Sequence, residues 1–305
     1  MSSWMEVSHG VSPSDDPLTV VVRRGETIEA VHQVIGVAAH DGRIIASVGD
    51  PHHRCSLRSS AKPVQAEVVH SAVPDLDARL LALACASHTA ETYHLTGVDE
   101  LLTLAGVDEG SLACGPQPDR QPSRRYNNCS GKHAAMLLAC AVNGWPTKGY
   151  EHRNHQLQQD VEGRLAERAG VRFAPDDFGV DGCGLPCHSM SLATMAGLFT
   201  RLDPVIAAAL RQFPLMVGGP GIDDSDLMSA MPGWTAKRGA EGLLCAQTSS
   251  GVGLAVKCLD GSSRPLRVAL AELCRRIDQP APAAWAVGTV SNTLGAPVGS
   301  ICAHH

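Results

Sequence analysis

Hydrophobic and polar positions divide the chain into two strand-rich ends and a helical middle. Near the start, β-branched residues dominate the runs Leu18 to Val22, Ile28 to Val37 and Ile44 to Val48. The dipeptide Asp41-Gly42 between the last two runs is typical of a tight hairpin turn. The sequence therefore predicts three antiparallel strands in this region.

The middle of the chain has the spacing of amphipathic helices. Clusters of Gly and Pro separate its apolar stretches, as expected for loops. The predicted helices cover residues 66–73, 78–86, 93–105, 132–142, 155–168, 190–202 and 205–213.

Strand character returns after residue 234. The runs Leu243 to Thr248 and Val252 to Leu259 flank Ser249-Ser250-Gly251, which predicts a second hairpin. Leu266 to Ile277 has the pattern of an amphipathic helix, and residues 285–302 contain short strand-like pieces.

Strands at both ends and helices between them predict an α/β (α+β) fold with one antiparallel sheet assembled from both termini. Helices would flank the sheet, and the middle would form a helical subdomain. We expect a flexible leader at 1–17 and a single domain at 18–305, with a sheet part at 18–62 and 234–305 and a helical part at 63–233. A cleft between the two parts would hold the site.

Composition narrows the class of protein. The net charge is −6 and no dense Lys/Arg run occurs, which argues against a nucleic-acid surface. No stretch is long and apolar enough for a membrane span, and the polar segment Met1 to Pro17 does not resemble a secretory signal. Eleven cysteines without an export signal predict reduced thiols, so we expect a cytoplasmic protein.

The first candidate for chemistry is Arg58-Ser59-Ser60-Ala61-Lys62-Pro63, which precedes an apolar helix. If the helix begins here, Ser59 and Lys62 share a face, because residues three apart are neighbours on a helix. A lysine that loses its proton can activate a serine, as in the S-x-x-K hydrolases. The alternative is a serine N-cap beside a solvated lysine.

A second candidate hydroxyl is Ser87, which lies at the end of an apolar helix and is followed by His88. His88 is placed to orient this serine. The alternative is that the segment only ends one helix and starts the next.

A third stretch, Tyr126 to His133, is polar and leads directly into an apolar helix. A thiolate at Cys129 would have a lowered pKa at such a helix start. The segment is not a phosphate-binding loop, because Tyr126 stands at the position of its first glycine and His133 replaces its Ser/Thr.

Asp181-Gly182-Cys183-Gly184 places a cysteine between two glycines, which indicates backbone close to a bound group. Cys183 and Cys187 lack the spacing of a structural zinc site, but Cys129 and Cys183 could meet in space with a nitrogen ligand. Two buried cysteines in a tight turn are the alternative.

Lys257 lies in the otherwise apolar strand Gly253 to Leu259. Burying a charged lysine there destabilises the fold unless the lysine is paired or has a lowered pKa. The alternative is a lysine that protects a sheet edge from aggregation.

Together these stretches resemble the rhizobial-type (class 3) L-asparaginases, the asparaginase II family. The similarity also includes Arg23-Arg24-Gly25 to Val31-His32, Asp226-Leu227-Met228 and Gly239-Ala240-Glu241-Gly242, and it spans nearly the whole chain. Such a resemblance implies a serine β-lactamase-like fold, usually a homodimer, and hydrolysis of L-asparagine to L-aspartate and ammonia.

The same resemblance implies site residues. It pairs Ser59 with Lys62 and Ser87 with Lys257 as catalytic groups. It places a metal, one zinc ion per chain, on Cys129, Lys132 and Cys183. Arg58, His88 and Asp181 are the expected substrate-binding residues, with Asp181 paired to the substrate ammonium.

Two segments depart from the family pattern, namely Thr89-Ala90 after the Ser-His pair and the loop Gly218 to Asp223. Both are expected to affect substrate fit. The alternatives are a different amide or β-lactam-type serine hydrolase, which should carry Ser-Asp-Asn and Lys-Thr-Gly signatures, and a non-catalytic zinc-binding homologue.

Overall fold

Residues 16–304 are described in the computed structural model, and their large sheet is built around one long strand, β2 (Thr27–His40). Strand β1 (Leu18–Arg24) pairs antiparallel with the first half of β2, and β3 (Arg43–Val48) pairs with its second half. Asp41 and Gly42 join β2 to β3 with φ of 48° and 74°, the backbone that an Asp-Gly hairpin turn requires. The predicted strands and their turn are confirmed.

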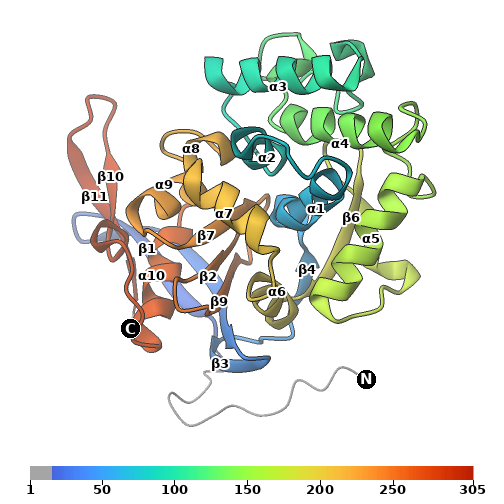
Figure 1. The fold of residues 1–305 in the computed structure, drawn as a ribbon. Coiled ribbons are helices and arrows are strands. Elements are labelled where there is room, and N and C mark those ends of the chain that lie inside the picture. The colour runs from blue at the N-terminus through green and yellow to red at the C-terminus, as the bar shows by residue number, and fades with distance from the viewer. Residues whose placement is uncertain (1–15, 305) are drawn as a thin grey trace. The chain divides into compact units, whose positions relative to one another are not determined.

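The two ends of the chain complete this sheet. Its strand order is β10-β11-β1-β2-β9-β8-β7, with β3 paired to β2, so the last strand lies beside the first (Figure 1). The additional strands are β7 (Thr235–Gly239), β8 (Leu243–Gln247), β9 (Gly253–Cys258), β10 (Gly288–Ser291) and β11 (Pro297–Ala303). The predicted antiparallel sheet from both termini is confirmed.

Two helices cover opposite faces of the sheet. Gly36 on β2 packs against α10 (Leu266–Arg276), whereas Gly253 on β9 packs so closely on α6 (Leu192–Phe199) that a Cβ would lie 2.0 Å from the Ala196 carbonyl oxygen. Gly36 pairs with Val256, which lies three positions from Gly253 on β9. Side chains at the positions of Gly36 and Gly253 would therefore lie on opposite faces of the sheet. The short helix η5 (Ala283–Trp285) follows α10.

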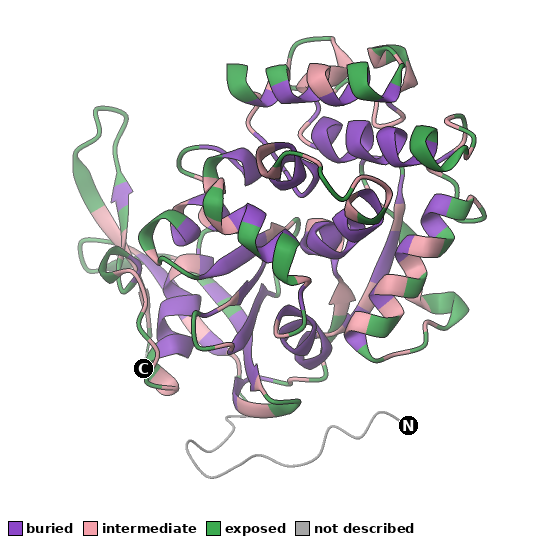
Figure 2. Cartoon of the chain, in the orientation of Figure 1, coloured by how far each residue is buried: buried purple, intermediate pink, exposed green. Residues whose placement is uncertain are grey.

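The helical part is arranged around α4 (Ser130–Asn143). All of its residues from Ser130 to Cys140 are buried, which is typical of a central helix (Figure 2). Gly131 permits the close approach of α2, because a Cβ there would lie 2.7 Å from the Leu83 carbonyl oxygen. Its neighbours are α1 (Lys62–Ala72), α2 (Ala78–Ala84), α3 (Thr92–Ala105) and α5 (Gln156–Ala169).

The middle of the chain also contains elements that the sequence pattern did not predict. A three-stranded sheet has the order β4-β6-β5, so residues 190 and 191 of the predicted helix 190–202 belong to a strand instead. The short strands are β4 (Arg54–Ser56), β5 (Phe178–Val180) and β6 (Pro186–Ser191). The remaining helices are η1 (Arg58–Ala61), η2 (Glu109–Ser111), η3 (Arg124–Tyr126), η4 (Pro175–Asp177), α7 (Pro204–Gln212), α8 (Pro214–Val217) and α9 (Asp223–Ala230).

Contacts within the chain define two compact units. The sheet unit comprises residues up to 55, 190–200 and those from 238 onward, and the helical unit comprises 56–189 and 201–237. The α/β (α+β) class is confirmed. The predicted domain boundaries stay predictions, and the leader at 1–17 lies almost entirely outside the described residues.

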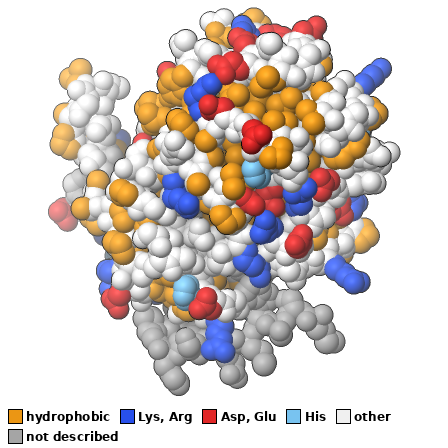
Figure 3. Space-filling view, in the orientation of Figure 1, with side chains coloured by type: hydrophobic (Ala, Val, Ile, Leu, Met, Phe, Trp, Pro, Cys, Tyr) orange, Lys and Arg blue, Asp and Glu red, His pale blue; other side chains and the backbone are white. Residues whose placement is uncertain are grey.

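No single helix among residues 16–304 is long and apolar enough to cross a membrane, although α6 and α7 taken as a broken pair have sufficient length and composition. On the face drawn in Figure 3, Lys and Arg side chains are scattered and interspersed with Asp and Glu.

Candidate active site

Lys62 lies buried at the first position of α1, only 1% exposed. The chain enters this helix through η1, so α1 begins four residues before the predicted helix 66–73, and Ser59 lies in the turn that precedes it. The Lys62 Nζ donates hydrogen bonds to the Ala86 carbonyl oxygen, to Ser87 Oγ at 2.9 Å and to Cys129 Sγ at 3.3 Å. The interpretation of Lys62 as a solvated lysine is therefore wrong.

Ser87 follows α2 and is almost fully buried. Its backbone N–H donates to the Val217 carbonyl oxygen at 2.8 Å, which fixes the segment against the end of α8. The hydroxyl meets the amine of Lys62 at hydrogen-bond distance, so the structure brings these two predicted catalytic residues together.

Ser59 lies on η1 and is half-buried. Within the part of the chain that the structure describes, its hydroxyl has no hydrogen-bond partner. The neighbouring Ser60 is fully buried and donates from Oγ to the Lys237 carbonyl oxygen at 2.9 Å, so the backbone beside Ser59 is anchored. The pairing of Ser59 with Lys62 stays a prediction.

Lys257 belongs to the sheet unit, on β9 between β2 and β8. Its Nζ donates to the carbonyl oxygens of Glu241 at 2.7 Å and Cys258 at 2.5 Å. The alternative of a lysine that protects a sheet edge is wrong, because β9 is an interior strand. The pairing of Lys257 with Ser87 joins residues of different units and stays a prediction.

Cys129, Lys132 and Cys183 form a buried cluster in the helical unit. Cys129 precedes the first residue of α4, Lys132 lies in its first turn, and the Lys132 Nζ is 3.1 Å from Cys183 Sγ. The structure therefore brings together the three residues that the family resemblance assigns to a metal.

Hydrogen bonds and neighbouring charges determine the protonation of this cluster. A hydrogen bond from the Cys183 thiol, together with the ammonium groups of Lys62 and Lys132, holds the pKa of Cys129 well below its usual value against the effect of burial. The hydrogen bond to Cys129 and burial raise the pKa of Cys183. Burial opposes the charge on Lys132, but the adjacent sulfurs of Cys183 and Cys129 raise its pKa. These directions favour the thiolate at Cys129 and the ammonium at Lys132.

These donors suit a thiophilic divalent cation. Two sulfurs and a nitrogen would supply three of the four ligands of a tetrahedral zinc site and leave one position open. A cation would take the place of the Cys183 thiol proton and of one proton on Lys132, because both groups ligate only when deprotonated. Cys187 is separate from this cluster, since its sulfur lies 2.6 Å from Ser56 Oγ.

Asp181 and Arg58 form an ion pair, with Arg58 Nε 2.8 Å from Asp181 Oδ1. Arg58 has a φ of 47°, a left-handed conformation that costs a non-glycine residue about 1 kcal/mol or more. Burial favours the neutral acid, but the charges of Lys132 and Arg58 and the Gly182 N–H lower the pKa of Asp181. Its carboxylate is therefore ionised beside the Cys183 turn.

His88 is fully buried, and both ring nitrogens are used within the protein. Nδ1 accepts from the Ala90 N–H at 3.1 Å, so the ring proton resides on Nε2, which is 3.0 Å from Ser130 Oγ. Burial and the neighbouring His94 hold the pKa of His88 well below its usual value. This arrangement favours a positioning role at the start of α4, and the predicted contact of His88 with substrate stays a prediction.

Sequence reasoning missed a buried ion pair between Lys237 and Asp224. Their side chains are fully buried, with Nζ and Oδ2 2.5 Å apart. Lys237 also supplies the carbonyl oxygen that anchors Ser60. No motif in the sequence links these two residues, and only the fold pairs them.

The two segments that depart from the family pattern contact each other. The Thr89 N–H donates to the Gly218 carbonyl oxygen at 2.9 Å, and a Cβ at Gly219 would lie 2.2 Å from Thr89 Oγ1. Ala90 has a φ of 65°, a conformation that favours glycine. Thr89-Ala90 and the Gly218 to Asp223 loop thus form one structural feature beside Ser87.

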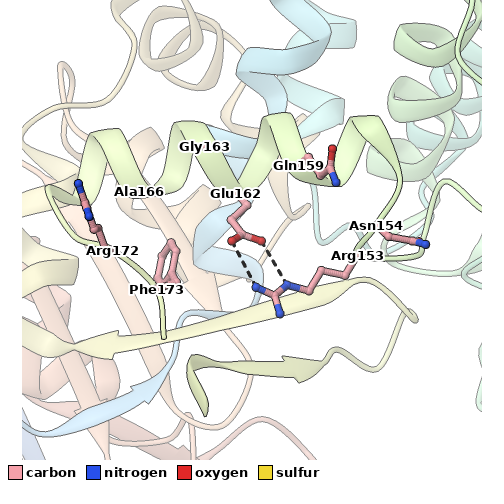
Figure 4. A pocket seen from close by; sticks show the side chains of 8 residues that line it. All are labelled: Arg153, Asn154, Gln159, Glu162, Gly163, Ala166, Arg172 and Phe173. Carbon is pink, nitrogen blue, oxygen red and sulfur yellow. Dashed lines mark hydrogen bonds and ion pairs between the residues drawn. The ribbon is translucent and has the colours of Figure 1, made fainter. Parts of the chain in front are cut away.

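A cavity of about 660 Å³ lies elsewhere in the helical unit, along α5 (Figure 4). Arg153 and Glu162 form an ion pair across it, and Phe173 points toward the helix. The cavity is lined by Arg153, Asn154, Gln159, Glu162, Gly163, Ala166, Arg172 and Phe173, which include none of the predicted site residues. The candidate site is the cluster around Lys62, not this cavity.

The chain matches the family model described as L-asparaginase II over residues 20–303. The protein belongs to the L-asparaginase II family, as its ordered sequence motifs predicted. No curated protein matches the chain.

The solved structures that match this chain have low sequence identity to it and low TM-scores. Mglu in its native form has a TM-score of 0.47 and 14% identity, over 80% of this chain and 64% of that one, so the chain spans less than two thirds of Mglu. A β-lactamase (Mb2281c) from Mycobacterium bovis has a TM-score of 0.44 and 15% identity, over 80% and 94%. EstCE1, a hydrolase with promiscuous acyltransferase activity, has a TM-score of 0.42 and 13% identity, over 78% and 92%. Similarities this distant do not indicate a substrate.

Proposed function

We propose that the protein hydrolyses the side-chain amide of L-asparagine to L-aspartate and ammonia through an acyl-enzyme on serine. Membership of the L-asparaginase II family supports the reaction. The buried contact in which the Lys62 Nζ donates to the Ser87 hydroxyl supports the mechanism, because it holds a lysine amine at hydrogen-bond distance from a hydroxyl out of bulk water.

In this proposal Lys62 first releases one ammonium proton to solvent, and its free amine then takes the hydroxyl proton while Ser59 attacks the amide carbon. The leaving nitrogen takes this proton from Lys62 as the C–N bond breaks. Ammonia departs, and an ester on Ser59 remains. Water hydrolyses this ester, and Ser87 with Lys257 moves the proton. The contact between Lys62 and Ser87 supports the part of this proposal in which Ser87 exchanges protons with Lys62.

A zinc ion on Cys129, Lys132 and Cys183 would act as a Lewis acid and a point of attachment when bound. Asp181, ionised and held by Arg58, would pair with the substrate ammonium. Cys129 also accepts a hydrogen bond from Lys62, so a change at the sulfur cluster would act directly on the proposed base.

The test is ammonia release from L-asparagine, measured beside L-glutamine and β-aspartyl compounds. Ser59→Ala should reduce kcat by about 10³-fold or more, as expected when a nucleophile is removed. Lys62→Met should cause a similar loss. Ser71→Ala, at an exposed position on α1, is the matched control and should remain active.

Full activity in Ser59→Ala together with inactive Ser87→Ala would assign the attack to Ser87 instead. Wild-type protein that releases ammonia from none of these amides would overturn the proposed function. A chromogenic β-lactam tests the second candidate, which shares the Ser59 and Lys62 pattern but lacks the other signatures of that class.

A further inference from the structure

A second cluster of metal-binding side chains lies in the sheet unit. Cys258 ends β9 and pairs with Val34 on β2, so His32, two residues along, points to the same face. The Leu259 N–H donates to the Gln33 carbonyl oxygen at 2.9 Å, and this bond turns the chain so that Asp260 meets His32. The sheet register thus places three different donors at one point.

The donor atoms of this cluster are in contact. His32 Nδ1 lies 2.6 Å from Asp260 Oδ2, and Cys258 Sγ donates to Asp260 Oδ1 at 2.9 Å. The Ser262 N–H also donates to Oδ1, at 2.8 Å. The nitrogen, the sulfur and the carboxylate oxygen all lie within 4.8 Å of one another.

Burial distinguishes this cluster from an ordinary surface ion pair. Cys258 is fully buried and the His32 side chain is only 8% exposed, whereas the Asp260 side chain is 47% exposed. His32 Nε2 is buried without a hydrogen-bond partner among the described residues. The cluster therefore has two shielded donors and one carboxylate that is open to solvent.

We propose that His32, Cys258 and Asp260 bind a thiophilic divalent cation, of which Zn²⁺ is the representative. Imidazole nitrogen, thiolate and carboxylate are the ligands that Zn²⁺ takes in proteins. At zinc–ligand distances of 2.0–2.3 Å, neighbouring ligand atoms lie about 3.5 Å apart, so the His32 nitrogen and the Asp260 oxygen, now 2.6 Å apart, must separate by about 1 Å.

Protons balance in this binding step. The Cys258 thiol loses its proton to solvent and the sulfur binds as thiolate. The His32 ring binds through Nδ1, so the proton that Nδ1 shares with Asp260 moves to Nε2 and the ring releases none. Asp260 is already ionised, since its hydrogen bond from Cys258 and its other partners lower its pKa to about 2.

This site shares no residue with the sulfur cluster of Cys129 and Cys183, and it does not depend on the proposed function. A cation at this site would affect Lys257, because the Lys257 Nζ donates to the Cys258 carbonyl oxygen. A cation on Cys258 would hold the end of β9, and with it the predicted catalytic lysine, in one place.

The experiment titrates Co²⁺ into the full-length Cys129→Ser/Cys183→Ser chain, which lacks the sulfurs of the first site. We expect about one equivalent of Co²⁺ with the absorption of a thiolate–cobalt bond. Adding Cys258→Ser should abolish this absorption, and Asp260→Asn should weaken binding at least about tenfold. Cys274→Ser, which alters another buried cysteine of the sheet unit, should leave the absorption unchanged.

Absence of the cobalt absorption in a folded Cys129→Ser/Cys183→Ser chain would overturn the proposal, and so would absorption that survives Cys258→Ser. If the double variant does not fold, zinc content decides the question. Wild-type protein should hold one equivalent more than Cys258→Ser, and equal zinc contents would refute the site.

Discussion

At the scale of single residues, Lys62 shows how burial organises the candidate site. An ammonium group has three donors, and Lys62 uses them on a carbonyl, a hydroxyl and a sulfur. Each partner lowers the cost of removing this charge from water. The same three contacts place the amine between the serine chemistry at Ser87 and the sulfur cluster at Cys129.

His188 is a buried residue that determines a response to pH. It is 3% exposed, packs on Phe173 and Phe178 with ring centroids 4.6 and 4.8 Å away, and has no hydrogen-bond partner for either nitrogen among the described residues. Burial lowers its pKa from 6.5 to about 4. The folded protein therefore holds this ring neutral.

We expect His188 to make the stability of the fold sensitive to acid. Between pH 6.5 and about 4 the unfolded chain protonates His188 and the folded chain does not, so the free energy of unfolding falls as the pH falls. This histidine should contribute about 3 kcal/mol of that loss. Urea unfolding of His188→Phe at several pH values should show a shallower slope.

His152→Phe, at an exposed position, controls for removal of an imidazole. An identical slope in wild type and His188→Phe would show that His188 does not remain neutral in the folded state.

At the scale of elements, the segment around Ser87 is fixed by the loop after α8. Ser87 and Thr89 donate from their backbone N–H groups to the carbonyl oxygens of Val217 and Gly218. These bonds resemble a short strand pair and leave no room above Gly219. The loop therefore supports the position of a predicted catalytic hydroxyl.

Gly219→Ala should destabilise the protein by about 1–3 kcal/mol and reduce ammonia release. Its φ of 114° disfavours a side chain, and the new Cβ would lie 2.2 Å from Thr89 Oγ1. Thr89→Ala in the same chain should restore part of the stability, because it removes that oxygen. Urea unfolding measures both effects.

Gly221→Ala is the matched control, since Gly221 has a φ of 77° but no atom within 4 Å of a new Cβ. It should show the cost of backbone strain alone. Equal losses at Gly219 and Gly221 would mean that the contact with Thr89 does not constrain the loop.

At the scale of the whole molecule, metal removal should lower stability. A ligand that binds only the folded chain stabilises it by about 3 kcal/mol at a hundredfold excess over Kd. Chelation of zinc-loaded protein should therefore lower Tm by several degrees, and Cys183→Ser should reduce this response. The fall in Tm that remains when Cys183→Ser is chelated reports the second site. Adding Cys258→Ser to this variant should remove the remaining fall.

A wild-type Tm that is unchanged by chelator, in protein that contains no zinc after loading, would contradict both metal assignments. Calorimetry measures the Tm, and zinc analysis of the same samples measures the bound metal. Together they distinguish protein that binds no zinc from protein that binds zinc without a change in stability.

Much of the local structure followed from sequence pattern alone. Alternation and Asp41-Gly42 predicted the first strands, and helical spacing predicted most helices, because burial on one face imposes a regular period. Pattern did not predict β6, since Pro186 to Ser191 resembles the start of the following helix. Strand pairing over such distances leaves no periodic signal.

The sequence by itself determined the family, the candidate chemical groups and the antiparallel sheet from both termini, since these depend on motifs and local periodicity. The tertiary structure alone decided that Lys62 contacts Ser87, that Asp224 neutralises Lys237 and that Asp260 meets His32. Such contacts join residues far apart in the chain, and they are determined by which faces pack together and by the cost of leaving a buried charge unpaired.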